Sequence, residues 1–268
     1  MAADRLGVVG YPVAHSLSPR IQNAGLEALG LDGWRYQLVP VPPELLEETV
    51  HGLPGAGFRG VSVTVPHKEA ALAIADRASR TAREIGAANT LTFEDGLTEA
   101  ENTDAPGFLA SLPAPPGPGD TALVLGAGGS ARAVAWALSR AGARVSVWNR
   151  TDARARELAL DLGVDAVAEP VAADLLVNCT VAGMEGDPFA ILPLGPDELA
   201  GYGTVVDLVY ADPEGRLLAA AGQAGAAVVD GLEILVRQGA IALERWTGMP
   251  APREAMRAAA RHEPGRQA

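Results

Sequence analysis

Short apolar segments alternate with helical patterns along the second half of the sequence, and this rhythm constrains the fold more than any other feature. Strands are expected at residues 121–125, 144–149, 174–179, 204–208 and 227–229, with helices at 130–141, 152–162 and 213–223. Each helix carries the chain back to the start of the next strand, so such strands pair in parallel. The pattern therefore predicts a parallel, doubly wound α/β sheet.

The first third combines the same rhythm with a hairpin. Strands are expected at 6–10, 34–41 and 60–65, a hairpin at 89–93 and 97–101, helices at 18–30, 43–51, 67–75, 79–85 and 104–112, and closing helices at 231–247 and 252–262. The hairpin turn contains Asp95-Gly96, a strong turn signal. Residues 113–119 hold four prolines and two glycines and cannot form regular structure. We expect this stretch to be the boundary between two folding units.

Charge and composition exclude several function classes. The net charge is −12 without any basic run, so the surface would repel a nucleic-acid backbone and no nucleic-acid partner is expected. No window approaches about 18 uninterrupted apolar residues, which predicts no membrane span, and the N-terminus lacks the pattern of a secretory signal. The single cysteine, Cys179, fits a reducing cytoplasm and is expected to be a buried strand thiol. The four histidines are scattered, so no metal site is predicted.

The basic residues contain the most informative count in the sequence. Of the 21 lysine and arginine residues, only Lys68 is a lysine. Arginine cannot give up its proton in a protein, whereas a lysine is a compact amine that can. A single lysine is ordinarily a solvated surface charge. In a chain that uses arginine everywhere else, Lys68 is instead predicted to lie where a proton must be transferred.

A dinucleotide-binding motif follows the first strand of the second half. The segment Gly126-Ala127-Gly128-Gly129-Ser130-Ala131 matches the pattern G-x-G-x-x-A between a strand and a helix. The first glycine allows a tight turn, the second allows the backbone to approach a pyrophosphate, and the alanine allows close helix packing. The N–H groups of the helix N-terminus favour the phosphate charge. We therefore predict a dinucleotide site here.

The end of the next strand indicates which dinucleotide binds. A domain that prefers NAD(H) usually has an acidic residue here for the ribose hydroxyl, but this chain has Asn149-Arg150-Thr151. Asn149 would not repel a 2′-phosphate, and Arg150, helped by Thr151 and Arg154, could pair with it. The alternative is that both arginines only cover the surface of a helix. The sequence favours NADP(H).

Six separated motifs, in this order, resemble the shikimate dehydrogenase family along nearly the full chain. They are Ser16-Leu-Ser18-Pro19, Val63-Thr64-Val65-Pro66-His67-Lys68, Gly86-Ala-Ala-Asn89-Thr90, Asn102-Thr103-Asp104, Asn149-Arg150-Thr151, and Gly231 to Gln238-Gly239. The glycine loop and the segment from Asn178-Cys-Thr180 to Gly183-Met184 agree with the family as well. Each motif alone is weak evidence, but their joint order is highly specific.

This resemblance implies a fold and a domain plan. It implies an N-terminal α/β substrate domain over 1–104 and a Rossmann-like, doubly wound NADP-binding domain over 105–238. The C-terminal helices, 239–268, would return to the first domain.

The resemblance also implies the chemistry, which is NADPH-dependent reduction of 3-dehydroshikimate to shikimate. Lys68 would transfer the proton, in agreement with the composition argument, and Asp104 would orient its amine and favour its charged form. The alternative for Asp104 is a helix N-cap after Asn102-Thr103, and one residue can do both.

By resemblance, short hydroxyl and amide side chains would bind the substrate. Ser16 and Ser18 would hold its carboxylate with help from Thr64, although both serines could equally cap a helix before Pro19. The full set expected at the substrate is Ser16, Ser18, Ser62, Thr64, Lys68, Asn89, Asp104, Tyr210 and Gln238. Ser62 departs from the family, because many relatives have Asn there and its shorter side chain reaches less far.

Further cofactor contacts are expected at Thr180, Leu208 and Gly231. His67 is left out of the site because its side chain should point away from that of Lys68 if the strand continues.

Two other functions compete with this one. A paralogue could oxidise quinate or use NAD, and a silent NADP-binding regulator could keep the scaffold, but Lys68 and Asp104 are both present. We expect a cytoplasmic monomer or homodimer whose partners are shikimate and 3-dehydroshikimate.

Overall fold

The chain folds into two compact units, each described here by itself. A computed structural model describes residues 4–210 and 215–261. The first unit comprises residues 1–103 and 235–268, and the second comprises residues 104–234.

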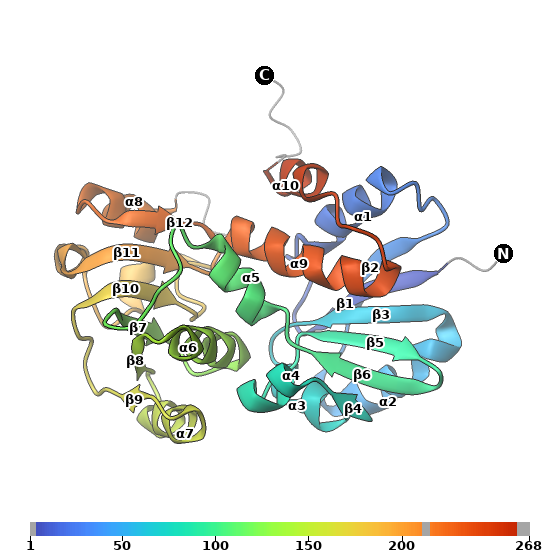
Figure 1. The fold of residues 1–268 in the computed structure, drawn as a ribbon, viewed down its shortest axis with the longest axis horizontal. Helices are drawn as coiled ribbons and strands as arrows, with labels where there is room; N and C mark the ends of the chain where they lie inside the picture. Colours follow the sequence, from blue (N-terminus) through green and yellow to red (C-terminus); the bar gives the residue numbers. More distant parts are fainter. Residues whose placement is uncertain (1–3, 211–214, 262–268) are drawn as a thin grey trace. The chain divides into compact units, whose positions relative to one another are not determined.

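A mixed six-stranded sheet forms the centre of the first unit (Figure 1). Its strands run in the order β2 (Arg35–Pro40), β1 (Arg5–Gly10), β3 (Phe58–Val63), β5 (Thr90–Glu94), β6 (Leu97–Glu101) and β4 (Arg77–Ala78). β1 pairs in parallel with both β2 and β3, whereas β5 is antiparallel to β3 and β6. The expected hairpin is confirmed, and Asp95 and Gly96 both adopt positive φ at its turn, as Asp-Gly turns favour.

Helices cover both faces of this sheet. The helices and 3₁₀ turns are α1 (Ser18–Ala28), η1 (Pro43–Leu45), α2 (Leu46–Gly52), η2 (Pro54–Ala56), α3 (Lys68–Ala73), α4 (Arg80–Ile85), α9 (Gly231–Thr247) and α10 (Arg253–Arg261). Leu46 and Val50 of α2 and Ala71 of α3 pack with Val61 and Val63 of β3 in one apolar cluster. On the other side, α1 packs against α10.

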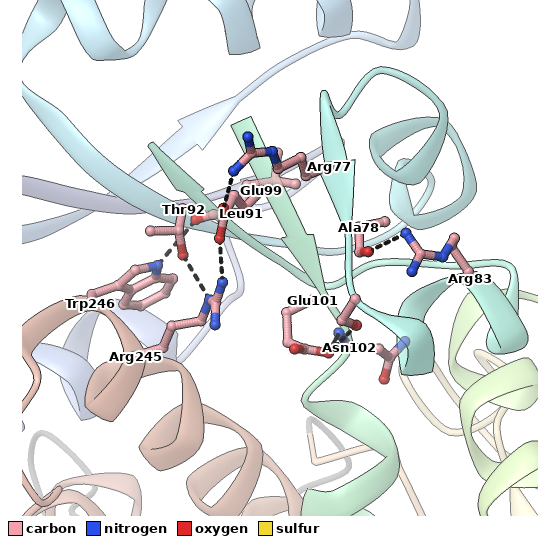
Figure 2. Close-up of polar contacts among 11 residues, drawn as sticks. Arg77, Ala78, Arg83, Leu91, Thr92, Glu99, Glu101, Asn102, Arg245 and Trp246 are labelled. Atoms are coloured by element: carbon pink, nitrogen blue, oxygen red, sulfur yellow. Dashed lines mark hydrogen bonds and ion pairs between the residues drawn. The ribbon is translucent and has the colours of Figure 1, made fainter. Parts of the chain in front are cut away.

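The carboxyl-terminal half of α9 is fixed to the sheet by one glycine and several polar contacts (Figure 2). The indole N–H of Trp246 donates to the carbonyl of Leu91 at 3.1 Å, directly over Gly60, where a Cβ would lie 2.1 Å from Nε1. Arg245 donates to Thr92 Oγ1 at 3.2 Å and pairs with Glu99 at 2.8 Å. The closing helices therefore complete the first unit.

The second unit contains an all-parallel sheet, as the sequence predicts (Figure 1). Its order is β12 (Ala227–Val229), β11 (Tyr202–Asp207), β10 (Ala173–Asn178), β7 (Thr121–Leu125), β8 (Arg144–Trp148) and β9 (Asp165–Ala166). If β7 is numbered as strand 1 and the sheet is read from β9 to β12, this is the order 3-2-1-4-5-6 of the Rossmann fold. In this order the strands are added first on one side of the central strand β7 and then on the other. The remaining elements are α5 (Asp104–Ser111), α6 (Gly129–Ala141), α7 (Asp152–Leu162), η3 (Pro188–Ala190), η4 (Pro196–Gly201) and α8 (Arg216–Gln223).

Several expectations need correction. The Pro/Gly stretch 113–119 is not the boundary, because the chain divides at Thr103/Asp104 and again at Ile234/Leu235. The preceding helix α5 packs against α6, and this contact assigns it to the second unit. Cys179 follows β10 instead of lying in it, and it is half-buried. The expected helices 213–223 and 252–262 are present as α8 and α10, but residues 213, 214 and 262 lie outside the described part.

Within residues 4–210 and 215–261, no helix combines the length and apolar character needed to cross a bilayer. The same part of the chain holds no group of three or more His, Cys, Asp or Glu side chains arranged to bind a metal.

Gly60→Ala should destabilise the protein. The added methyl group meets Trp246 Nε1 at 2.1 Å and the Leu91 carbonyl at 2.6 Å, so the indole must move and lose its hydrogen bond. Overpacking of this kind costs ~1–3 kcal/mol. Urea denaturation should show the loss, and Gly33→Ala, where no atom lies within 4 Å of the new Cβ, is the matched control.

The Thr121–Asp174 pair should make stability depend on pH. The hydroxyl and the backbone N–H of Thr121 donate to Asp174 Oδ2 at 2.7 and 2.8 Å, and these bonds hold the pKa of Asp174 below its usual 3.8. A pKa lowered by folding adds stability above the unfolded-state pKa and loses it as pH falls through the folded-state pKa.

The urea midpoint of the wild type should therefore fall between about pH 5 and pH 2 more steeply than that of Asp174→Asn. The effect is small because this carboxylate is exposed. Asp165→Asn, an exposed substitution in the edge strand β9, is the control and should keep the wild-type slope. Equal slopes for the wild type and Asp174→Asn would contradict the prediction.

Candidate active site

Strand direction gathers the predicted substrate residues of the first unit at one edge of its sheet. β1 and β3 run in parallel, so their carboxyl ends lie at the same edge. Ser16 and Ser18 follow β1, whereas Thr64 and Lys68 follow β3. Because β5 is antiparallel to β3, it begins at that edge, and β6 returns to it. Asn89, just before β5, and Thr103, after β6, therefore lie there too.

A polar network connects two of these positions, Asn89 and Thr103, with Gln238 of α9. Asn89, which is 2% exposed, accepts the Thr103 backbone N–H at 2.7 Å. Its amide group donates to Thr103 Oγ1 at 2.9 Å and to Gln238 Oε1 at 3.2 Å. Gln238 is further fixed by a bond from its Nε2 to the Leu235 carbonyl at 2.9 Å. The structure thus brings the predicted residues Asn89 and Gln238 into direct contact, together with Thr103, to which the sequence analysis gave no role.

Lys68 is not a solvated surface charge. It is the first residue of α3, it is only 9% exposed, and its carbonyl accepts the N–H of Ala88 at 2.8 Å. Because Ala88 adjoins Asn89, this bond ties the backbone of the lysine to the polar network. Burial of a lysine requires compensation by partners, so it indicates a specific role more strongly than composition did.

The backbone at His67 differs from the strand conformation on which its exclusion from the site depended. The strand does not continue through it, since β3 ends at Val63 and His67 precedes α3 as its N-cap. The ring is 1% exposed, and Nε2 lies 2.7 Å from the carbonyl of Val41. The argument from strand alternation therefore does not apply, and the imidazole anchors the turn that presents Lys68.

Neither serine is the N-cap of α1, which was the alternative to their expected role in binding the substrate carboxylate. The N-cap of α1 is Leu17, which has no side-chain capping bond, and Ser18 begins the helix. Ser16 Oγ instead accepts the Ser18 N–H at 3.3 Å. Ser62 lies within β3, where side chains alternate, so it shares a face with Gly60, the face covered by α9. Thr64 has its methyl group against Gly10.

Asp104 and Tyr210 belong to the second unit. Asp104 directly follows Thr103 and begins α5, so chain connectivity joins it to the polar network. Tyr210 follows β11 and is half-buried. The pairing of Lys68 with Asp104 remains a prediction.

The glycine loop lies at the carboxyl end of β7, the central strand where the sheet order reverses. Gly126 has φ +112, and a Cβ there would lie 3.2 Å from the backbone of Cys179. At Gly128, the N-cap of α6, a Cβ would meet nothing within 4 Å, so the backbone faces open space. Ala131 is fully buried. This loop fits a pyrophosphate at a helix N-terminus, the placement that dinucleotides take in such sheets.

The end of β8 fits a 2′-phosphate. Asn149 Nδ2 donates to the Thr151 carbonyl at 3.0 Å, and Thr151 is the N-cap of α7. Arg150 and Arg154 are exposed at this helix N-terminus, where a cation gains nothing from the helix dipole. Two arginines at a positive helix end favour an anion as their partner over simple coverage of the helix surface.

Three predicted cofactor residues follow the other strands of the same sheet. Thr180 follows β10, Leu208 follows β11 and Gly231 follows β12, all at carboxyl ends. Gly231 lies against Leu208, whose carbonyl oxygen would be 2.6 Å from an added Cβ. Asn178 and Asp207, the last residues of β10 and β11, are buried between these loops. Asn178 occurs in a motif of the sequence analysis and Asp207 lies at the end of an expected strand, but the periodicity gave no sign of their pairing.

The parallel sheet, its strand order and the glycine turn at the reversal point define a dinucleotide-binding protein of the Rossmann class. Three family models match the chain. Their descriptions are Shikimate dehydrogenase substrate binding domain for residues 8–91, Shikimate / quinate 5-dehydrogenase for residues 115–179, and Shikimate 5'-dehydrogenase C-terminal domain for residues 231–261.

Individual relatives agree with these models. The shikimate dehydrogenase (NADP(+)) of Methylobacterium radiotolerans is 47% identical over 269 residues, covering 94% of both chains. The structure of shikimate dehydrogenase from Aquifex aeolicus has a TM-score of 0.90 at 38% identity, covering 97% of this chain and 98% of that one. That of the Thermus thermophilus enzyme, in complex with NADP(H) and shikimate, has a TM-score of 0.85 at 44% identity, covering 96% and 98%.

The chain therefore belongs to the shikimate dehydrogenase family of NADP-dependent oxidoreductases, which act on a CH–OH group.

Proposed function

We propose that the protein catalyses the reversible, NADPH-dependent reduction of 3-dehydroshikimate to shikimate, on the route to chorismate and the aromatic amino acids. The observation that carries this proposal is the burial of the only lysine beside the Asn89–Thr103–Gln238 network, in a member of this family. Residues 1–104 with the closing helices 239–268 would bind substrate, and residues 105–238 would bind NADP(H). The single cysteine supports a reducing cytoplasm, where the protein would act as a monomer or homodimer.

The reaction asks for one proton donor beside a ketone. NADPH, when bound, supplies the hydride that adds to the carbonyl carbon of the substrate. The Lys68 ammonium polarises the carbonyl oxygen by a hydrogen bond and gives it a proton as the alcohol forms; in reverse, the neutral amine accepts that proton. Asp104 would orient the amine by a hydrogen bond. Burial of Lys68 strengthens these electrostatic effects because water screens them less.

The remaining polar residues would recognise a small ring that carries hydroxyls and a carboxylate. Ser16 and Ser18 would donate to the carboxylate, assisted by Thr64. The ring hydroxyls would meet Asn89, Asp104 and Gln238, with Tyr210 and Ser62 completing the site. The fixed orientation of Asn89 and Gln238 supports this role, because side chains that are already ordered lose less conformational entropy when the substrate binds.

Replacing Lys68 separates proton transfer from charge. Lys68→Ala should lower kcat by ~10²–10⁴-fold with the KM for shikimate within a few-fold of wild type. Lys68→Arg keeps the positive charge but cannot release a proton, so it should be nearly as slow. Steady-state assays of NADP⁺ reduction measure both. Wild-type turnover in Lys68→Arg would contradict proton transfer by this residue, and a wild type inactive with shikimate and NADP⁺ would contradict the function.

Arg150 and Arg154 should set cofactor choice. Arg150→Ala should raise the Kd for NADPH by about ten-fold or more, because a charge-assisted bond to the 2′-phosphate is lost, while NADH binding stays the same. Fluorescence titration with each cofactor measures this. Arg156→Ala, which removes a cation of the same helix that pairs with Asp152, is the control and should leave the ratio of affinities unchanged.

Specificity would be tested with shikimate and quinate, each with NADP⁺ and NAD⁺. The proposal expects the highest kcat/KM for shikimate with NADP⁺. Faster turnover of quinate with NAD⁺ would favour a quinate-oxidising paralogue instead.

A further inference from the structure

Two buried polar side chains pair at the carboxyl edge of the second sheet, and the proposed reaction gives neither of them a step. Asn178 and Asp207 are directly opposite each other in the parallel pair β10–β11. Their exposed fractions are 0% and 4%. Asn178 Nδ2 donates to Asp207 Oδ1 at 2.9 Å. A carboxylate withdrawn from water in this way is costly unless its bonds are specific, so its retention needs a reason.

Asn178 organises the turn that contains Thr180. Its side-chain oxygen accepts the backbone N–H of Thr180 at 3.0 Å and the hydroxyl of Thr180 at 2.7 Å. Its amide nitrogen also donates to the carbonyl of Ala182 at 3.2 Å. The Thr180 hydroxyl in turn accepts the N–H of Ala182 at 3.0 Å. One amide thereby fixes both the backbone and the side-chain direction of Thr180.

Asp207 organises the loop that follows β11. Its Oδ1 accepts the N–H of Val209 at 3.0 Å, beside the bond from Asn178. The backbone N–H of Leu208, the residue between Asp207 and Val209, donates to the Asn178 carbonyl at 3.0 Å. Gly231 then packs so closely on Leu208 that a Cβ would lie 2.6 Å from its carbonyl oxygen. The position of Leu208 therefore determines where the first residue of α9 can lie.

The pair thus connects three expected cofactor residues, Thr180, Leu208 and Gly231, which come from three separate loops. We propose that Asn178 and Asp207 are positioning residues that hold these loops in register for the nicotinamide end of NADPH. This inference rests on the proposed function for the identity of the cofactor. The 2′-phosphate is expected at Arg150, after β8, which is not hydrogen-bonded to either β10 or β11.

Three variants test the proposal. Asp207→Leu removes the acceptor while keeping similar volume, and Asn178→Ala removes the bonds to Thr180 and Asp207; the second carries the test if the first does not fold. Asp207→Asn keeps a side-chain oxygen for Asn178 and Val209 and should rescue. The matched control is Asp174→Ala, which breaks the Thr121–Asp174 pair between β7 and β10 at the opposite end of the sheet.

Binding is measured with NADPH and with adenosine 2′,5′-bisphosphate, which has the 2′-phosphate but no nicotinamide. Asp207→Leu and Asn178→Ala should bind NADPH about ten-fold more weakly and bind the bisphosphate as wild type does. Asp207→Asn and Asp174→Ala should stay within about three-fold of wild type for both ligands. In turnover, kcat should fall in the first two variants with the KM for shikimate nearly unchanged, and the isotope effect with deuterated NADPH should increase.

Other results overturn the inference. Equal weakening of NADPH and bisphosphate binding would mean general destabilisation, and wild-type affinity for both would mean that the pair only stabilises the fold. Failure of Asp207→Asn to rescue would contradict positioning through the oxygen. These titrations need no turnover, so they decide the inference even if the wild type does not reduce 3-dehydroshikimate. In that case the proposed substrate is wrong, whereas the role of Asn178 and Asp207 in positioning the cofactor is still tested by the titrations.

Discussion

Parallel pairing of strands is the constraint on which both candidate sites depend. A parallel strand must begin again at the same edge, so every carboxyl end in such a sheet opens onto a common side. In the second unit this brings the loops after β7, β8, β10, β11 and β12 to one edge. In the first unit β1 and β3 do the same, and the hairpin β5–β6 returns to that edge through its antiparallel turn. Strand pairing alone therefore brings residues that are far apart in sequence close together, without specific contacts between their side chains.

Buried amides then convert proximity into fixed geometry at both edges. Asn89 binds Thr103 and Gln238 in the first unit, and Asn178 binds Thr180 and Asp207 in the second. An amide suits this task because it offers donors and acceptors together without a net charge to desolvate. The two sites therefore share one device, in which an asparagine at a strand end fixes the loop of the neighbouring strand.

The sequence predicted most of the second unit because its signals are local. The helices predicted from apolar periodicity at 152–162 and 231–247 have the same bounds as α7 and α9. The short strands β4 and β9 went unpredicted, since two residues carry no periodicity. The expectation of a boundary at 113–119 was wrong for a related reason. Pro and Gly in 113–119 report local backbone freedom, whereas assignment of α5 depends on its packing against α6, which no local pattern encodes.

The same distinction applies to the candidate sites. Composition singled out Lys68 and motif order singled out Asn89 and Gln238, but the support from Thr103 and the Asn178–Asp207 contact arises only when distant strands pair. His67 shows the limit most clearly, because a correct rule about alternating side chains was applied to a segment that had already left the strand. Sequence identifies candidate reacting groups, and tertiary structure identifies the side chains that would orient them.

The discontinuous first unit has a consequence for how the protein is made. Its strands leave the ribosome first, whereas α10 and α9, whose Trp246 covers Gly60, are synthesised only after most of the second unit. Until then the nascent chain exposes an unfinished apolar surface while residues 104–234 can already fold. Domains usually mature in order from the N-terminus, so this architecture reverses the order of completion. A chain stalled or truncated after residue 234 would lack α10 and the part of α9 that packs on the first sheet, so its first unit would stay incomplete.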